Sequence, residues 1–246
     1  MTKLLITIPC YNEEIVLKKN IKIISQYAQD NFYEFEWRIL IIDNASKDST
    51  WQVAQVIKQE KNEKIILDQE FDKGRGVALR KAWQKFSDYD IYSYMDADLA
   101  TDLKDFKLLI SKVSEGFDFV TGSRYLREAD VKRDFKREFL SRIYNFILKI
   151  YLGVKFKDAQ CGFKAFSKRL TQELIPQTQD AGWFWDTELM ILAYRHNYKV
   201  LEIPVSWREV RDELRASKVS HWSEVKRQLK NIYKMKKRLR YLNIKN

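Results

Sequence analysis

Two acidic residues follow an apolar, strand-like run in the middle of the chain. Residues 90–95 have the length and composition of a buried strand, and Asp96 and Asp98 come directly after it with the small Ala97 between them. Two carboxylates at a strand end suit a hard divalent cation, since Mg²⁺ takes one or two protein carboxylates and leaves its other positions to phosphate and water. The pattern therefore predicts a cation shared with a diphosphate, and a solvated acidic turn is the alternative.

Two other strand-like runs, 3–9 and 37–43, also end in polar residues. After the first run, Tyr11 could stack on a base and Glu13 could bond a sugar or a base edge, although an acid there also suits a helix N-terminus. Asp43 is the expected ligand after the second run. The first loop lacks the glycines that let a backbone approach a pyrophosphate, which argues against NAD or FAD.

A basic loop and an aromatic-rich segment complete the set. The loop 73–76 (KGRG) lacks the third glycine of the dinucleotide fingerprint but suits phosphate contacts. In the segment 183–189 (WFWDTEL), Asp186 and Glu188 lie among three aromatic residues. Carboxylates so placed are either buried helix caps or site residues.

Alternating strand and helix patterns must position these residues. The first half predicts strands at 3–9, 37–43, 64–68, 90–95 and 117–122, with helices at 13–27, 48–59, 76–86 and 102–114. The second half predicts helices at 136–152, 167–174, 186–196 and 219–242, with a strand at 200–207. Repeated strand–helix units indicate an α/β fold with a mainly parallel sheet and helices on both faces. Ligands bind such sheets at the carboxyl ends of the strands.

Composition limits the class of protein. The chain has 246 residues, 45% hydrophobic and 14% aromatic, which predicts one packed domain rather than a disordered or fibrous chain. Two cysteines cannot form a disulfide framework, and the N-terminus has no secretion signal, so a cytoplasmic location is expected. Isolated His196 and His221 argue against zinc.

The net charge of +11 is unevenly distributed. Residues 131–157 carry +6 and residues 217–246 carry +9, and both segments are rich in large apolar residues. Basic amphipathic segments are typical of membrane-surface or nucleic-acid-binding elements. Nucleic acid is not expected, because the basic residues avoid the strand-end loops and no nucleic-acid motif is present.

The element pattern and these charges predict one α/β domain at 1–216 and a basic amphipathic tail at 217–246. The tail and the helix 136–152 are expected to dock peripherally on an anionic bilayer, at its cytoplasmic face. The alternative is that the apolar stripe of the tail packs on the domain while its basic face is solvated.

Eight segments in order match a known family: IPCYNEE (8–14), IIDNASKDST (41–50), KGRGVALR (73–80), DADLAT (96–101), TGSRY (121–125), DAQCGFKAF (158–166), WFWDTEL (183–189) and EIPVSW (202–207). With them the chain resembles the family 2 glycosyltransferases of the GT-A (Rossmann-like) fold. Within that family it resembles the polyprenyl-phosphate sugar transferases, most of all the dolichyl-phosphate β-glucosyltransferases. The mannosyl branch usually carries Gln where this chain has Ala100.

The resemblance implies a nucleoside-diphosphate sugar donor, UDP-glucose, a dolichyl or polyprenyl phosphate acceptor, and Mg²⁺ or Mn²⁺. It implies roles for the following residues: Pro9, Tyr11, Glu13, Asp43, Lys73 and Asp96 at the nucleotide and diphosphate; Asp98 at the metal; Gln160, Lys164, Asp186 and Glu188 at the sugar; Lys218 over the diphosphate; and Arg124, Arg137 and Ser141 at the acceptor phosphate. Residues 208–216 lengthen the segment before Lys218 relative to the glucosyl relatives.

The implied reaction inverts the anomeric centre and gives a β-linked product. A phosphomonoester is largely dianionic at neutral pH, so it can attack the sugar without a general base. Asp186 and Glu188 are then expected as partners of sugar hydroxyls or of arginine. The alternatives are transfer of mannose or another sugar, a sugar-hydroxyl acceptor in polysaccharide synthesis, or a membrane-bound scaffold with an inactive transferase core.

Overall fold

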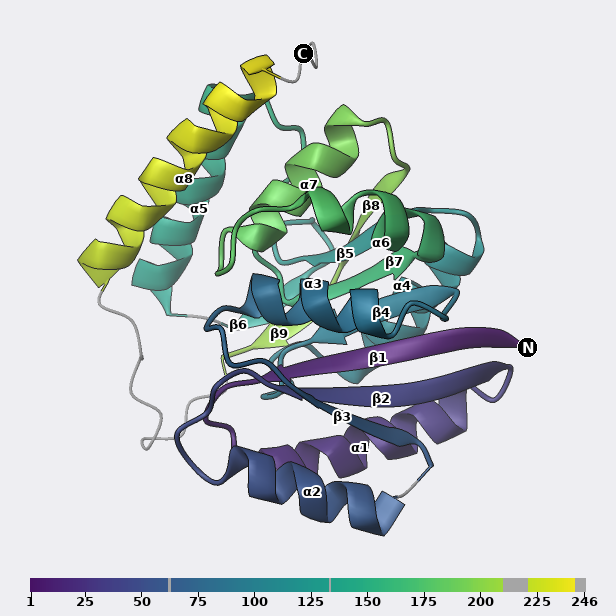
Figure 1. Ribbon diagram of the computed structural model, residues 1–246. Coiled ribbons are helices and arrows are strands. Elements are labelled where there is room, and N and C mark those ends of the chain that lie inside the picture. Colours follow the sequence, from purple (N-terminus) through teal and green to yellow (C-terminus); the bar gives the residue numbers. More distant parts are fainter. Residues whose placement is uncertain (62, 133, 210–220, 242–246) are drawn as a thin grey trace.

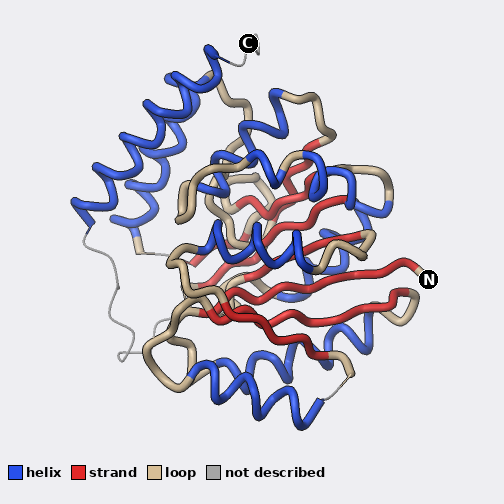
Figure 2. The backbone as a smooth tube through the Cα atoms, in the orientation of Figure 1, coloured by secondary structure: helices blue, strands red, loops and turns tan. Residues whose placement is uncertain are grey.

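A seven-stranded sheet forms the centre of the molecule in the computed structural model, which describes residues 1–61, 63–132, 134–209 and 221–241 (Figures 1 and 2). The strand order is β3-β2-β1-β4-β7-β5-β8. The strands are β1 (Thr2–Cys10), β2 (Phe35–Asp43), β3 (Ile65–Gln69), β4 (Ile91–Met95), β5 (Phe119–Ser123), β7 (Phe163–Ser167) and β8 (Val200–Pro204). β7 runs antiparallel to β4 and β5, and the other pairs are parallel. A small second sheet pairs β6 (Asp130–Lys132) with β9 (Ser206–Arg208).

Helices cover both faces of this sheet. One face packs on α1 (Leu17–Asn31), α2 (Thr50–Lys61) and α4 (Phe106–Ser114), which follows the short turn η1 (Leu103–Asp105). The other face packs on α3 (Arg75–Lys85), α6 (Lys168–Glu173), the turn η2 (Ile175–Gln177) and α7 (Trp185–Arg195). The α/β class predicted from the sequence, a mainly parallel sheet with helices on both faces, is confirmed.

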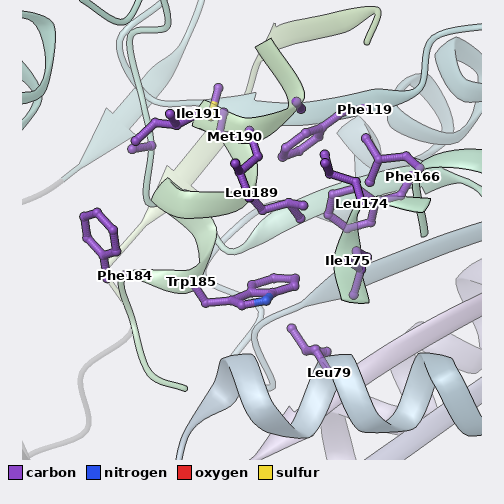
Figure 3. Close-up of a cluster of buried hydrophobic side chains, with 14 of the residues drawn as sticks. Leu79, Phe119, Phe166, Leu174, Ile175, Phe184, Trp185, Leu189, Met190 and Ile191 are labelled. Carbon is purple, nitrogen blue, oxygen red and sulfur yellow. The ribbon is translucent and has the colours of Figure 1, made fainter. Parts of the chain in front are cut away.

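Alternation along the strands separates the two cores. In β1, Leu4, Ile6 and Ile8 contact the α1 side, whereas Leu5 contacts the α3 side. This follows from the period of two in a strand, where successive side chains point to opposite faces. On the α3 side, the buried Trp185 of α7 lies across from α3 (Figure 3).

Two long helices lie side by side outside the α7 layer: α5 (Phe135–Leu152) and α8 (His221–Tyr241) (Figure 1). Ile232, Met235 and Leu239 of α8 are buried in the same apolar cluster as α7. Part of the predicted tail stripe therefore packs on the domain. The predicted domain boundary at 216/217 lies outside the described residues.

The strands differ from the expectation in three places, and the three-residue strand β6 is one that was not predicted. β7 was not predicted, because a five-residue strand directly after the polar segment 158–162 has no alternating pattern long enough to identify it. The predicted strand 200–207 is two strands, since β8 stays with β5 as far as Pro204 and β9 then pairs with β6. None of the helices within the described ranges is long and apolar enough to cross a membrane.

Candidate active site

The loops after β1, β2 and β4 meet at one edge of the sheet. Cys10 at the end of β1 pairs with Asp43 at the end of β2, and Met95 at the end of β4 pairs with Phe163 at the start of β7. Asn12, Ala45 and Leu99, one in each of these loops, have left-handed backbones with φ of 56°, 56° and 55°. Non-glycine residues in this region carry strain that tends to gather at functional sites. This edge is the candidate active site.

The predicted nucleotide residues lie at the β1 and β2 end of this edge. The buried Asp43 carboxylate accepts hydrogen bonds from the Ser46 N–H and the Gln69 side chain, both at 3.3 Å. The exposed Lys73 places its ammonium 5.8 Å from the centre of the Tyr11 ring. A basic group, an aromatic face and a carboxylate thus lie together.

Pro9 and Glu13 frame the same loop. Pro9 is half-buried in β1 opposite Ile42, and the Glu13 N–H donates to the Thr50 hydroxyl at 2.7 Å. The Glu13 carbonyl accepts the N–H of Leu17 at the start of α1. The Glu13 backbone therefore fixes the loop to α1 and α2.

A charge network of Arg75, Asp96, Lys164 and Asp186 with Tyr94 lies at the β4 and β7 end of this edge. The Arg75 guanidinium donates to Asp96 at 3.1 Å and to Asp186, and it lies 4.4 Å from the centre of the Trp183 ring. Asp186 is fully buried and also accepts from the Tyr94 hydroxyl.

Lys164, which is fully buried on β7, completes this network. Its ammonium lies 3.4 Å from Asp186 and also donates to the Cys161 carbonyl. Charges buried this deeply are stable only when paired, so Lys164 and Asp186 hold each other in place. The structure thus brings together three of the residues assigned to the diphosphate and sugar: Asp96, Lys164 and Asp186.

Asp96 lies at the solvent side of this network: its side chain is 43% exposed, and the protein covers the rest of it. Its pKa is raised to about 6, first because the surrounding protein removes part of the hydration of the carboxylate and then because of the neighbouring Asp98 and Asp186 charges, while Arg75 acts in the opposite direction. The Asp96 carboxylate lies directly against Gly162, where an added Cβ would be 2.1 Å from Oδ2. With the carboxylate in this position, only glycine fits beneath it.

Asp98 and Asp96 are the residues at this edge that fit a divalent cation. Asp98 is half-buried, and its Oδ1 accepts the Ala100 N–H at 3.0 Å. Within the described ranges no group of three or more His, Cys, Asp or Glu side chains could hold a metal. Two carboxylates fit Mg²⁺ or Mn²⁺ when a diphosphate supplies further oxygens.

Arg124, predicted at the acceptor phosphate, forms a buried two-pronged pair with Asp158. Its Nε and Nη2 donate to the two Asp158 oxygens at 2.7 and 2.9 Å. Arg124 holds the pKa of the fully buried Asp158 below its usual range, against the effect of burial. Asn145 joins α5 to this region by donating to the Ser141 carbonyl and accepting the Ala159 N–H.

Four other predicted residues are placed less directly. The Ser141 hydroxyl is buried and has no hydrogen-bond partner within the described part of the chain. Gln160 is half-buried, and its backbone N–H donates to the Asp158 carboxylate at 3.2 Å. The side chain of Arg137 and the whole of Lys218 lie outside what the structure describes.

Glu188 lies apart from the charge network although it is two residues from Asp186. Its carboxylate accepts the N–H groups of Gln179 and Asp180, both at 2.8 Å, and pairs with Arg238 of α8 at 2.5 Å. The arginine partner expected from the sequence is therefore present for both carboxylates, Arg75 for Asp186 and Arg238 for Glu188.

Arg75 and Trp183 carried no role in the sequence analysis. Arg75 was visible as one member of the basic glycine loop, and its place between Gly74 and Gly76 is the signal that could have singled it out. An added Cβ at Gly74 or Gly76 would lie 2.0 Å from the Ala181 carbonyl oxygen or 2.6 Å from that of Asp180. The glycines therefore let the 180–182 loop pack directly against the start of α3.

Three curated relatives are 30–32% identical to this chain over the aligned residues. Glycosyltransferase AglD of Haloferax volcanii is 30% identical over 203 residues, covering 82% of this chain and 32% of the relative. Dolichyl-phosphate beta-glucosyltransferase ALG5D of Trichomonas vaginalis is 32% identical, covering 82% of this chain and 65% of the relative. The dolichyl-phosphate beta-glucosyltransferase of Dictyostelium discoideum is 30% identical, covering 96% and 74%. The chain thus spans about a third of the first of these relatives and about two thirds of the second.

Solved structures of glycosyltransferases share the fold. Glucosyl-3-phosphoglycerate synthase of Mycobacterium tuberculosis, crystallised with Mn²⁺, UDP and phosphoglyceric acid, has a TM-score of 0.67 at 15% identity and covers all of this chain and 80% of its own. Mannosyl-3-phosphoglycerate synthase of Rubrobacter xylanophilus has a TM-score of 0.70 at 17% identity, covering 100% and 76%. The GT-A fold is confirmed. The family model "Glycosyl transferase family 2" matches residues 5–175, which include the strand-end loops with Asp43, Asp96 and Arg124, so the chain belongs to glycosyl transferase family 2.

Proposed function

We propose that this chain transfers glucose from UDP-glucose to dolichyl or another polyprenyl phosphate, with inversion, at the surface of an anionic membrane. The observation that carries the proposal is the match to a dolichyl-phosphate beta-glucosyltransferase over 96% of the chain. The residues that the resemblance assigns to the donor, among them Asp43, Lys73, Asp96 and Asp98, follow successive strands along one sheet edge, which supports a common ligand.

Asp186 and Glu188 are already bound to other groups of the protein, which favours a phosphate acceptor over a sugar hydroxyl. Asp186 is held by Arg75, Lys164 and Tyr94, and Glu188 is held by Arg238 and two backbone amides. A carboxylate fixed by cations is a weak base, and a phosphate dianion needs none. The site has then to position the reactants and stabilise the charge of the leaving diphosphate.

A divalent cation at Asp98 would neutralise charge on the leaving diphosphate. In this proposal Lys73 contacts the same diphosphate, Tyr11 stacks on the nucleobase and Asp43 bonds the nucleoside. Asp96, held by Arg75, orients the donor next to them. The glucose is placed over the charge network.

The proposed membrane contact is supported by α5. Five of its apolar side chains follow one another at helical spacing and are all exposed: Phe135, Phe139, Ile143, Phe146 and Ile150. An apolar stripe of this length on a basic segment is typical of a helix that lies in a membrane interface. A polyprenyl tail stays in the bilayer, so its phosphate has to be met at the membrane surface, where α5 would lie. The negative surface of the cytoplasmic leaflet would attract these basic helices, which supports a peripheral, cytoplasmic location.

The donor and acceptor are tested with a panel of radiolabelled sugars. UDP-glucose, UDP-galactose, UDP-N-acetylglucosamine and GDP-mannose are each offered with dolichyl phosphate, and in parallel with a free sugar acceptor. We expect label in the lipid fraction with UDP-glucose and a β linkage in the product. Label in the sugar acceptor alone would favour polysaccharide synthesis, and label from GDP-mannose alone would overturn the assignment of glucose.

The membrane contact is tested by co-sedimentation with vesicles of anionic or neutral lipid. Removing two exposed rings with Phe139→Ser and Phe146→Ser should abolish binding to anionic vesicles, because each buried Phe contributes about 1.5–3 kcal/mol. Tyr33→Ser, at a ring that is 71% exposed between α1 and β2, is the matched control and should bind like the unchanged protein. Equal binding of both variants would refute a contact through α5.

A further inference from the structure

The C-terminal helix α8 holds a loop that forms one wall of the active site. This loop, Gln179 to Trp183, lies between α8 on one side and the start of α3 on the other. A cavity of about 200 Å³ lies between the loop and α8, lined by Asp180, Glu188, Asn231 and Arg238 among others. Polar side chains contact the loop from α8, and backbone groups contact it from α3.

On the α8 side, Asn231 contacts the loop directly and Arg238 acts through Glu188 and Gln177. Asn231 donates to the Asp180 carboxylate at 2.8 Å, and the other oxygen of that carboxylate accepts the Gly182 N–H at 2.8 Å. Arg238 pairs with Glu188 at 2.5 Å and donates to the Gln177 carbonyl at 2.7 Å. Glu188, only 3% exposed, in turn accepts the first two N–H groups of the loop.

On the α3 side, the loop backbone contacts the residues around Arg75. The Val77 N–H donates to the Ala181 carbonyl at 3.2 Å. The two glycines that flank Arg75 leave no space between the loop and the start of α3. At the end of the loop, the Trp183 ring covers the Arg75 guanidinium at 4.4 Å. A shift of this loop would therefore move Arg75, which holds Asp96.

From these contacts we infer that Arg238 and Asn231 are positioning residues for the donor site: through the 179–183 loop they fix Arg75 and, with it, Asp96. The inference rests on the proposed function for its kinetic consequences, whereas its structural consequence is independent of any substrate. It also explains why Glu188, close to Asp186 in sequence, faces α8. Glu188 links α8 to the loop, because its carboxylate binds the Arg238 guanidinium and accepts the Gln179 and Asp180 N–H groups.

Hydrogen exchange of the substrate-free protein tests this coupling directly. Arg238→Met keeps most of the side-chain stem and removes the guanidinium. It should speed exchange of the Gln179, Asp180 and Val77 amides about tenfold, since hydrogen bonds to charged groups contribute on the order of that factor. Arg240→Met removes the same charge from an exposed position on the same helix and is the matched control. Arg238→Lys, which keeps the charge, should restore part of the protection.

Kinetics of the same variants give the second measurement. For Arg238→Met we expect kcat/KM for the nucleotide sugar to fall about ten- to a hundredfold while the KM for lipid phosphate stays unchanged, because displaced donor contacts cost factors of this size. Asn231→Ala should change both measurements in the same direction and serves if Arg238→Met does not fold.

Each outcome decides one of the two proposals. If the exchange rates and the donor kinetics of Arg238→Met and Asn231→Ala equal those of Arg240→Met, the positioning role is wrong. If exchange of the three amides changes while no sugar is transferred even by the unchanged protein, the coupling stands and the proposed function fails.

Discussion

At Gly162, one added methyl group should lower the activity strongly and the stability of the fold only slightly. It lies beneath the Asp96 carboxylate, where an added Cβ would be 2.1 Å from Oδ2 and 2.5 Å from Cγ. Contacts of this kind do not fall below 3.0 Å, so the carboxylate has to move by about 1 Å. The Gly162 backbone is not left-handed, so the substitution Gly162→Ala acts through space alone.

The displaced group is the end of a short side chain, so the fold should tolerate the change. Overpacking of this kind costs about 1–3 kcal/mol. For a chain of this size the melting temperature should then fall by roughly 2–12 °C, at about 2–4 °C per kcal/mol. We expect this shift to weaken the Arg75 contact to Asp96, which is 3.1 Å long. A misplacement of about 1 Å can lower turnover about a hundredfold, and we expect that loss in kcat/KM for the nucleotide sugar.

Gly182→Ala is the matched control for this experiment. Its Cβ would meet the nearest atom, Asp180 Oδ1, at 3.6 Å, which is ordinary contact, and its backbone is not left-handed either. Thermal unfolding, calorimetric UDP affinity and sugar transfer are measured for both variants. If Gly162→Ala transfers sugar within about threefold of Gly182→Ala, the position of the Asp96 carboxylate does not matter and the reasoning fails.

Three further substitutions test the charges at this edge. Asp98→Asn should lower turnover about a hundredfold or more, and EDTA should have the same effect on the unchanged protein. Near-normal activity in either experiment would show that the assignment of a metal to Asp98 is wrong. Because the pKa of Asp96 is raised to about 6, kcat/KM should fall below about pH 6. The Arg75 charge lowers that pKa, so Arg75→Met should move the acid side of the pH profile to higher pH. A pH profile that does not move would contradict the role of Asp96 in this pH dependence. Arg124→Met should cost about 3–5 kcal/mol in denaturant unfolding because Asp158 stays buried without its counter-charge, and adding Asp158→Leu should recover most of it. A loss confined to the KM for lipid phosphate would instead place Arg124 at the acceptor.

Local patterns predicted the edge of the sheet correctly. β-Branched apolar runs identify β1, β2 and β4, and the rule that ligands bind at the carboxyl ends of parallel strands brings Asp43, Asp96 and Asp98 to one place. Both steps depend on residues near one another in sequence. Local sequence patterns are therefore sufficient to predict the strands and the edge at which their loops meet.

Partners far apart in sequence could not be predicted in this way. Arg75 and Asp186 are 111 positions apart, and Arg124 and Asp158 are 34 apart. Nothing in the sequence near Arg124 distinguishes a guanidinium that awaits a phosphate from one already paired with a carboxylate. Burial decides this, and burial depends on the whole fold.

The tail shows a second limit of periodicity. A helical stripe reports that one face is apolar and does not report what covers it. In α8, Ile232, Met235 and Leu239 pack into the protein core, and Leu229 and Tyr233 of the same predicted stripe stay exposed. In α5 a longer stripe is exposed, from Phe135 to Ile150. The membrane contact proposed from the sequence for both helices therefore rests mainly on α5 for its apolar part.

The balance of charges explains why this edge should need a cation from outside. Arg75 and Lys164 are already paired with Asp96 and Asp186, so these buried cations neutralise the protein's own carboxylates. Lys73 is exposed and able to turn toward a diphosphate, but one ammonium does not balance the charge that develops on the leaving group. Asp98, on the neighbouring loop, adds a negative charge that would repel the diphosphate unless a divalent cation lies between them. The carboxylate and the ligand then neutralise the same ion, and the buried network can remain rigid while the sugar is transferred.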